Sequence, residues 1–519
     1  MALIHIIESF QPRNDEALLA KAEAAAPALH HSTHHPKTAW LGLPGRGGRL
    51  LPAGTLTPLE KGDTLVLDLG DHYVGTCRLT LTTRGSHPDA PAWLRLRFAE
   101  ILDELYEAPE DYHGWVSSSW IQDERVHVDL LPGELALPRR YAFRYLAVEV
   151  LDTSPKYKLV VDELTVDATT SADDDALPQV RVTDPELDRV YRVGLRTLRS
   201  CMQREFEDGP KRDRRLWIGD LRLQALSNAA SYRNMDLVRR CLYLFGGTRF
   251  PDGRVSACLF TQPEPAADDT WLFDYGLFYP VILEEYLRER PDPEALADLG
   301  PIALEQLHYA LGLVGADGVV NETAAANTFV DWQETMDKTA CAQSILIYAL
   351  GYGEALANRL GRALEAGELA AQRAALAKTA RARFWDPARE RVVSGGQENL
   401  ASLVWMILAG VLTPQEADRA LAQADELSKN GPMMTPYMHH YYITALLIAG
   451  RREQALGHIR YYWSSMIRAG ADTFWEAWIP EHPDASPYGS RVINSYCHAW
   501  SCTPVYLLHT HFPELLASI

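Results

Sequence analysis

The segment FEDGPKRDRRLWIGD, residues 206–220, crowds charged side chains of both signs around a Gly-Pro turn and a tryptophan. Carboxylates accept hydrogen bonds, guanidinium and ammonium groups donate them, and an indole ring offers an apolar face. The acids and bases balance, so the net charge is near zero and suits a neutral, hydroxyl-rich ligand. The four acids and four bases are Glu207, Asp208, Asp213, Asp220, Lys211, Arg212, Arg214 and Arg215.

Further along the chain, tryptophans stand beside acidic or histidine residues in several short segments. A tryptophan in a helix-rich chain usually packs in the core, but core packing does not require a neighbouring carboxylate. An indole face that stacks on C–H groups, next to carboxylates that accept hydrogen bonds from hydroxyls, is typical of sugar binding. The segments are WLFDYGLFY (271–279), FVDWQETMDK (329–338), DTFWEAW (472–478) and NSYCHAWSCTP (494–504).

Two carboxylates that are far apart in the sequence but face one pocket can hydrolyse a glycosidic bond. One acts as a general acid on the leaving oxygen, and the other activates water or attacks the anomeric carbon. From chemistry alone, the candidates are an acid of the 208–220 cluster and Glu476. The chain has no HExxH motif, and we expect neither a metal site nor a cofactor.

Composition restricts the class of partner. The chain has 519 residues, of which 47% are apolar and 23% charged, and its net charge is −19. An acidic protein lacks the basic face that nucleic acids and anionic membranes require. The start, MALIHIIESFQPRNDE, does not resemble a signal peptide, and the seven scattered cysteines suggest reduced thiols, so we expect a cytoplasmic protein. The sequence is compatible with a homodimer.

The elements that must position these residues fall into two regions. Residues 48–170 contain alternating apolar positions, as in DTLVLDLGDHYVGTCRLTLTTRG (63–85) and WLRLRFAE (93–100), separated by turns. Several short alternating strands predict a β-sandwich, which we assign to residues 1–178.

The pattern changes to helical near residue 180. Asp184 and Pro185 are typical of an N-cap and first helical position, and apolar residues then follow on one helical face. Roughly a dozen helical patterns over residues 179–519 predict an (α/α)6 barrel. A helical solenoid is the competing architecture, but no fixed sequence repeat supports it.

Together these segments resemble the α-L-rhamnosidases of glycoside hydrolase family 78. DGPKRDRRLWIGD (208–220) is similar to the family's Asp-x-Pro-x-Arg-Asp-Glu…Trp-x-Gly-Asp loop. TFWEAW (473–478) and CHAWSCTPVYLL (497–508) are similar to its Trp-Glu and His-x-Trp-Ser…Pro segments. The resemblance covers residues 180–510 and extends to a preceding β-domain, so it implies a β-sandwich followed by an (α/α)6 barrel.

The resemblance also implies an activity and residue roles. The activity would be hydrolysis of terminal, non-reducing α-L-rhamnose with inversion. Because the start of the chain does not resemble an export signal, we expect the substrates to be small, imported rhamnosides. The family's general base falls on Glu476. Its sugar-binding positions fall on Asp208, Arg212, Trp217, Asp220, Trp332 and His498, with Trp271 and Asp274 matched by the position of their loop.

One residue departs from the family pattern. The family places its general acid, a glutamate, directly after the Arg-Asp pair, where this chain has Arg214. Arginine does not donate a proton near neutral pH. Either Asp213 or Asp220 takes the role, or the acid is missing. We favour Asp213, because the segment is one residue shorter before the tryptophan and Asp213 stands beside the vacant position.

Two other functions fit the same residues. The first is another (α/α)6 glycosidase, acting on a different deoxy sugar or on a uronic acid that Arg212 or Lys211 would bind. The second is a sugar-binding protein without catalysis, which the loss of the expected glutamate would permit.

Overall fold

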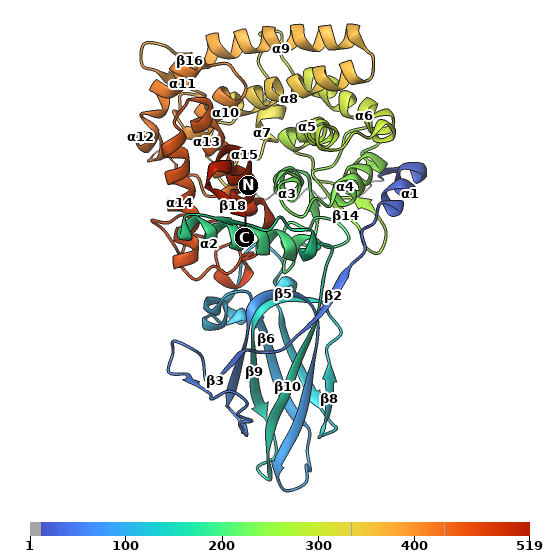
Figure 1. The fold of residues 1–519 in the computed structure, drawn as a ribbon, viewed down its shortest axis with the longest axis vertical. Helices are drawn as coiled ribbons and strands as arrows, with labels where there is room; N and C mark the ends of the chain where they lie inside the picture. Colours follow the sequence, from blue (N-terminus) through green and yellow to red (C-terminus); the bar gives the residue numbers. More distant parts are fainter. Residues whose placement is uncertain (1–11, 334, 430, 519) are drawn as a thin grey trace.

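The computed structural model describes residues 12–333, 335–429 and 431–518. The chain forms a β-rich part and a helical part, which Figure 1 shows one below the other. Strands β2 (His30–His34) to β10 (Tyr157–Thr170) make the β-rich part, and helices α2 (Pro185–Cys201) to α15 (Pro504–His511) make the helical part. The mixed architecture predicted from the sequence is confirmed, with the β-rich domain preceding the helical one.

The long strand β5 (Thr64–Gly85) organises the sheet. Its first half pairs with β3 (Thr38–Leu41) and β9 (Tyr141–Asp152), and its second half pairs with β8 (Gly133–Ala136) and β10. The register with β9 shifts between Asp68 and Tyr73, where the strand passes from one set of partners to the other. The described sheet is completed by β2 beside β10, β4 (Arg49–Leu50) beside β3, and β6 (Ala92–Ala99) and β7 (Asp123–Val128) beyond β9.

The two halves of β5 are buried differently. In the second half, buried residues alternate with more exposed ones. Cys77, Leu79 and Leu81 are buried, whereas the intervening Arg78 and Thr80 are not, as expected for a strand with one face in the core. In the first half Val66 is buried as well as Leu65 and Leu67. The second face is covered because the segment after β6, which includes the 3₁₀ turn Leu102–Tyr106, packs on it.

The described N-terminal residues pack on the helical part although they precede the sheet. Strand β1 (Arg13–Asn14) pairs with β13 (Thr248–Arg249), and α1 (Glu16–Ala24) lies against α4 (Met235–Gly247). The Asp15 side chain caps α1. The division of the chain between residues 178 and 179 stays a prediction.

The predicted start of the helical part is confirmed. Asp184 caps α2 by accepting hydrogen bonds from the backbone nitrogens of Glu186 and Leu187 at 3.0 and 3.1 Å, and Pro185 occupies the first helical position. Of the apolar side chains that recur along α2, Leu195 is half-buried, and the others are buried: Leu187, Val190, Tyr191 and Leu198.

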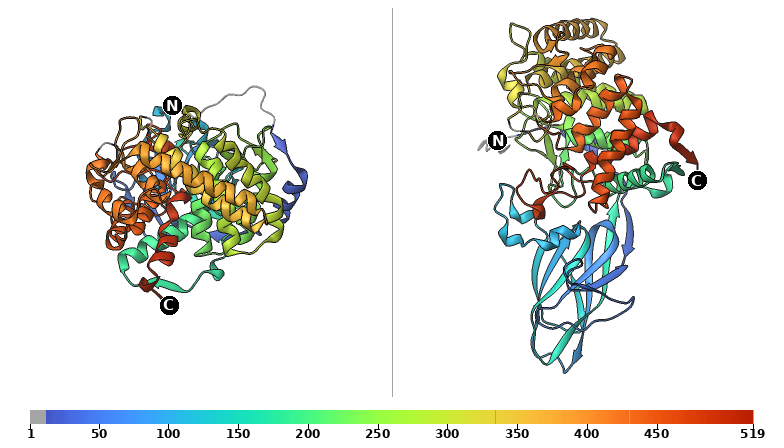
Figure 2. Two further views of the ribbon diagram at one scale, coloured as in Figure 1. Left: turned by 90° about the horizontal axis from the view of Figure 1, so that it is seen from above. Right: turned by 90° about the vertical axis from the view of Figure 1, so that its left-hand side faces the viewer.

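The remaining helices pack around an apolar core. Figure 2 shows them from above. They are α3 (Ile218–Ala229), α5 (Phe273–Glu289), α6 (Pro293–Leu311), α7 (Glu322–Ala326), α8 (Thr339–Arg359), α9 (Ala363–Phe384), α10 (Leu400–Leu408), α11 (Pro414–Leu421), α12 (Ala424–Ser428), α13 (Pro436–Ile448) and α14 (Arg452–Arg468).

Short strands connect parts of the helical domain. β12 (Leu216–Trp217), β14 (Cys258–Phe260) and β15 (Ala266–Ala267) form a small sheet, β16 (Trp385–Asp386) pairs with β17 (Arg391–Val392), and β11 (Val180–Val182) pairs with β18 (Leu516–Ser518). All seven cysteines are buried free thiols. Within the described residues, no helix combines the length and apolar character needed to cross a membrane.

Candidate active site

A cavity of about 330 Å³ lies where loops of the helical domain meet one loop of the β-rich domain. The helical domain contributes all of its charged lining. From the helical domain the lining residues are Asp208, Arg212, Asp213, Arg215, Trp217, Asp220, Asp268, Asp269, Thr270, Leu272, Tyr275, Phe329, Trp332, Glu476, Tyr488, His498 and Trp500, and from the β-rich domain they are Trp115, Val116, Ser117 and Trp120.

The 208–215 loop is closed by its own hydrogen bonds. The Asp208 nitrogen donates to the carbonyl of Arg215, and the Arg215 nitrogen donates to the Asp208 carboxylate, both at 3.0 Å. A Cβ atom at Gly209 would lie 2.4 Å from the Ser495 hydroxyl and 2.6 Å from the Arg212 carbonyl, so only glycine fits this turn. The chain then continues through β12 into α3, whose first turn carries Asp220.

Asp220 and His498 form an ion pair at the buried end of the cavity, with 3.0 Å between Oδ1 and Nε2. The other ring nitrogen of His498 lies 3.2 Å from the Ser495 hydroxyl. Burial alone would lower the pKa of His498, but the hydrogen bond with Asp220 and the charge of Glu476 raise it to about 9. Burial raises the pKa of Asp220, and His498 opposes this.

Glu476 is held by two donors in the same cavity. Its carboxylate accepts hydrogen bonds from Arg212 Nη2 and from the Tyr488 hydroxyl. Burial raises the pKa of Tyr488 well above 10, so the hydroxyl keeps its proton. The Arg212 guanidinium lies over the Tyr488 ring, 4.2 Å from its centre, and Arg212 Nε donates to the Ile493 carbonyl at 2.9 Å. These contacts fix the Glu476 carboxylate against the cavity wall.

Arg212 also contacts Asp213, with 3.4 Å between Nη1 and Oδ1, so its guanidinium lies between the carboxylates of Asp213 and Glu476. The Asp213 side chain keeps 20% of its surface exposed, whereas that of Glu476 keeps 5%. Burial and the charge of Asp213 raise the pKa of Asp208 well above its usual value, and His498 opposes this. One cavity therefore brings together carboxylates in different surroundings.

Arg214, which stands where a proton donor was expected, does not line the cavity. Its backbone has φ +58°, and its guanidinium donates to the carbonyls of Pro210 and Arg140, both at 2.8 Å. Burial and the neighbouring Arg140 lower the pKa of Arg214 to about 10. The side chain thus points to the domain interface and leaves its place in the cavity to other groups.

Eight of the predicted site residues line this cavity, and two do not. Those that line it are Asp208, Arg212, Asp213, Trp217, Asp220, Trp332, Glu476 and His498. Trp271 packs against Arg254 and Tyr309. Asp274 is buried and accepts hydrogen bonds from the backbone nitrogens of Phe329 and Val330 at 3.1 and 3.2 Å. Asp274 therefore holds the loop that carries Trp332.

Residues 53–168 match the family model of the glycosyl hydrolase family 78 alpha-rhamnosidase N-terminal domain, and residues 176–512 match that of the bacterial alpha-L-rhamnosidase 6 hairpin glycosidase domain. The chain belongs to the α-L-rhamnosidases of glycoside hydrolase family 78. It is a glycoside hydrolase.

Solved structures agree with this family. A rhamnosidase from Klebsiella oxytoca with rhamnose bound is 44% identical, and the match covers 96% of this chain and 99% of that one with a TM-score of 0.90. A family 78 rhamnosidase of Bacillus sp. GL1 is 23% identical over 89% of this chain and 47% of that one, with a TM-score of 0.72, and supports the fold alone. No curated protein sequence matches the chain.

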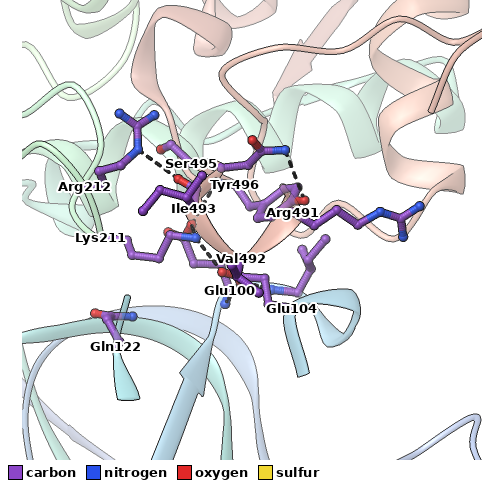
Figure 3. A network of polar contacts seen from close by, with 12 residues as sticks. Glu100, Glu104, Gln122, Lys211, Arg212, Arg491, Val492, Ile493, Ser495 and Tyr496 are labelled. Atoms are coloured by element: carbon purple, nitrogen blue, oxygen red, sulfur yellow. Dashed lines mark hydrogen bonds and ion pairs between the residues drawn. The ribbon is translucent and has the colours of Figure 1, made fainter. Parts of the chain in front are cut away.

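A buried network of ion pairs and hydrogen bonds connects the loop before Asp213 to the β-rich domain (Figure 3). Lys211 pairs with Glu104, and its ammonium lies 3.4 Å from Glu100. Glu100 also accepts a hydrogen bond from the backbone nitrogen of Tyr496 at 2.7 Å. Burial raises the pKa of Glu104 to about 7, and Lys211 opposes this. The residue next to Arg212 is therefore anchored by the other domain.

Among the described residues, His72, Glu100 and Cys497 are grouped closely enough to hold a metal ion, within 4.8 Å of one another. The His72 ring nitrogens already lie 3.0 Å from the Ser200 hydroxyl and 3.1 Å from Glu100. Lys211 supplies a positive charge beside the same carboxylate. We therefore read the group as part of the domain interface.

The sequence reasoning missed the part of the site that comes from the β-rich domain. Trp115, Val116, Ser117 and Trp120 line the cavity, as does Tyr488. The signal was present in DYHGWVSSSWIQDE (111–124), which carries two tryptophans in a stretch without strand alternation. Figure 2 shows this loop reaching from the β-rich domain to the helical one.

Proposed function

We propose that the chain is an inverting exo-α-L-rhamnosidase that removes terminal, non-reducing α-L-rhamnose from small glycosides. The observation that carries the proposal is the placing of Asp213 and Glu476 on either side of Arg212 in one cavity. The family, and the 44% identical rhamnosidase with rhamnose bound, support the choice of sugar.

The buried end of the cavity would hold the rhamnose ring. Asp208 and Asp220 offer carboxylate oxygens that accept hydrogen bonds from its hydroxyls, His498 holds Asp220 in place, and Trp217 and Trp332 offer apolar faces. The Trp332 indole nitrogen is buried and has no hydrogen-bond partner among the described residues, so it is free to donate to a hydroxyl. A buried polar end of this kind suits a terminal sugar.

Asp213 would act as general acid and Glu476 as general base. Asp213 gives its proton to the glycosidic oxygen as the bond from that oxygen to the anomeric carbon breaks. Glu476 takes a proton from a water molecule that attacks the same carbon from the opposite face. An inverting pair needs room for that water, with carboxyls about 6.5–9.5 Å apart. The guanidinium of Arg212 between the two carboxylates supports such a spacing. Asp220 is the alternative acid.

The charged groups argue against a uronic acid as substrate. Arg212 is already paired with Glu476, and Lys211 points away to Glu100 and Glu104. Arg215 lies 3.4 Å from Asp268. Each cation that would bind a substrate carboxylate therefore has a carboxylate partner.

We also infer the finer architecture: the chain divides between residues 178 and 179, with a β-sandwich before the division and an (α/α)6 barrel after it, and the described residues 13–24 pack on the barrel. The apolar core that both halves of β5 line, and the helices that pack around a core of their own, support it. The name of the second matched domain, a 6 hairpin glycosidase domain, supports the barrel.

Proton NMR of the first product tests the proposal. The enzyme is mixed with p-nitrophenyl α-L-rhamnoside, and the anomeric signal of the released sugar is followed before mutarotation. We expect β-L-rhamnose to form first. Initial α-L-rhamnose would show retention. Turnover of other aryl glycosides but not the rhamnoside would show a different sugar specificity, and binding of rhamnose without any turnover would show a sugar-binding protein.

A further inference from the structure

We propose that residues 115–120 of the β-rich domain form the binding site for the leaving group, and that this site selects flat aromatic aglycones. The inference rests on the proposed function, because it assigns the part of the substrate that remains when the sugar is placed at the buried end.

The cavity changes character with depth. At its buried end lie Asp208, Asp220, Glu476 and His498, each at most 4% exposed. At its open end lie Trp115, which is 45% exposed, Ser117, which is exposed, and the partly buried Val116 and Trp120. A terminal sugar that enters the polar end leaves its aglycone at the aromatic end.

The aromatic loop is held in position before any ligand binds. The Tyr112 hydroxyl donates to the Val116 carbonyl at 2.8 Å, and the Trp115 indole nitrogen donates to the Pro487 carbonyl at 3.4 Å. A Cβ atom at Gly114 would lie 2.6 Å from the Tyr488 carbonyl, so glycine permits this approach. A preorganised loop loses little conformational freedom when a ligand binds.

Apolar packing adds to these hydrogen bonds. The partly buried Val116 and Trp120 pack against a small apolar cluster. Its buried members are Tyr112 of the β-rich domain and Tyr488, Val492 and Ile493 of the helical domain. The Trp115 ring lies 5.6 Å from the Tyr488 ring, centre to centre. Trp115 therefore keeps its place although almost half of its surface faces solvent.

The chemistry of the loop favours an aromatic group over a second sugar. Of the four residues of this loop that line the cavity, only Ser117 offers a hydroxyl, and none is charged. The Trp115 N–H is already engaged with Pro487. A sugar in this place would leave several hydroxyls without protein partners, whereas a flat aromatic ring stacks on an indole without needing any.

The test compares leaving groups across variants. We would measure kcat/KM for p-nitrophenyl α-L-rhamnoside, methyl α-L-rhamnoside and a rhamnosyl-glucose disaccharide in wild type, Trp115→Ala, Trp115→Phe and Trp120→Ala. Trp93→Ala is the matched control, because Trp93 is a 38% exposed tryptophan of the same domain that stacks on His127 and does not line the cavity.

We expect Trp115→Ala and Trp120→Ala each to lower kcat/KM for the aryl substrate about tenfold, because one aromatic contact is worth roughly that factor. The methyl substrate should change less than about twofold, and Trp115→Phe should recover most of the loss. Inhibition by free L-rhamnose should not change, because the sugar end is untouched.

Three results would overturn the inference. Equal losses on the aryl and methyl substrates would show a general effect on the catalytic groups. A loss on the disaccharide as large as on the aryl substrate would show a sugar-binding subsite. No loss on either would show that the loop does not bind the leaving group. These outcomes leave the proposed function intact, whereas a wild-type enzyme that releases no L-rhamnose from any of the three overturns both.

Discussion

His498 and Asp220 form a buried ion pair, 3.0 Å from Nε2 to Oδ1, that joins the first turn of α3 to a loop near the C-terminus. The side chains are 4% and 3% exposed, so water screens the pair little. Because the interaction raises the pKa of His498 to about 9, the histidine is positively charged at neutral pH. This pair makes stability depend on pH.

We expect the free energy of unfolding to fall as pH rises from 7 to 10, and His498→Gln to reduce that fall. The pKa of His498 is about 6.5 in the unfolded chain and about 9 in the folded one. Its stabilising contribution is therefore complete below about pH 6.5 and is lost as the pH rises through about 9. The contribution is at most about 3 kcal/mol. Urea unfolding at pH 7 and 9.5 measures it, with the exposed His482→Gln as control. An equal decline in His498→Gln and wild type would contradict the expectation.

Glu476→Gln should lower kcat on an aryl rhamnoside by about 10²–10⁴, because the amide cannot accept a proton from water. The Gln side chain is of nearly the same size, so KM should change little. The exposed Glu481→Gln, in the same loop, is the control and should keep full activity. Near-full activity of Glu476→Gln would show that another group acts as the base.

The general acid can be identified by comparing how each substitution changes kcat on substrates whose leaving groups do and do not need a proton. Asp213→Asn should lower kcat about 10²–10⁴ for methyl α-L-rhamnoside, which needs protonation, but far less for 2,4-dinitrophenyl α-L-rhamnoside, whose leaving group needs no proton. Asp220→Asn should slow both substrates to a similar degree, because it disturbs His498 and the sugar site. The reverse pattern would assign the acid to Asp220.

Much of the site could be predicted because its residues lie in short segments with their own chemistry. Asp208, Arg212, Asp213 and Asp220 belong to one loop, and Glu476 stands between tryptophans. The strand alternation around β5 and the cap at Asp184 likewise follow from local rules. Local pattern therefore indicated both the β-rich and helical regions and most of the charged groups.

What the sequence could not supply is the direction of side chains and the meeting of distant segments. Arg214 follows Asp213 directly, yet its φ of +58° turns it to the domain interface. Asp274 was expected at the ligand but binds backbone nitrogens of another loop. Trp115 meets Tyr488 only because the two domains pack together. Such relationships depend on tertiary contacts that no local pattern contains.

The last prediction concerns the buried network of Lys211, Glu100 and Glu104 between the domains. Lys211→Met should lower the free energy of unfolding by about 3–5 kcal/mol, because it leaves the buried Glu104 without its cation and leaves Glu100 with His72 alone. Glu104→Leu combined with Lys211→Met should cost less than the sum of the single changes, because a buried charge is removed with its partner.

Urea unfolding of the four proteins in this cycle measures the coupling. The control is Arg78→Met, which breaks an ion pair with Asp167 whose side chains are 43% and 40% exposed, and it should cost less than about 1 kcal/mol. Lys211→Met should also lower kcat, because Lys211 precedes the Arg212 that contacts Glu476. Additive single and double changes, with unaltered kcat, would show that the network neither couples the domains nor positions the carboxylates.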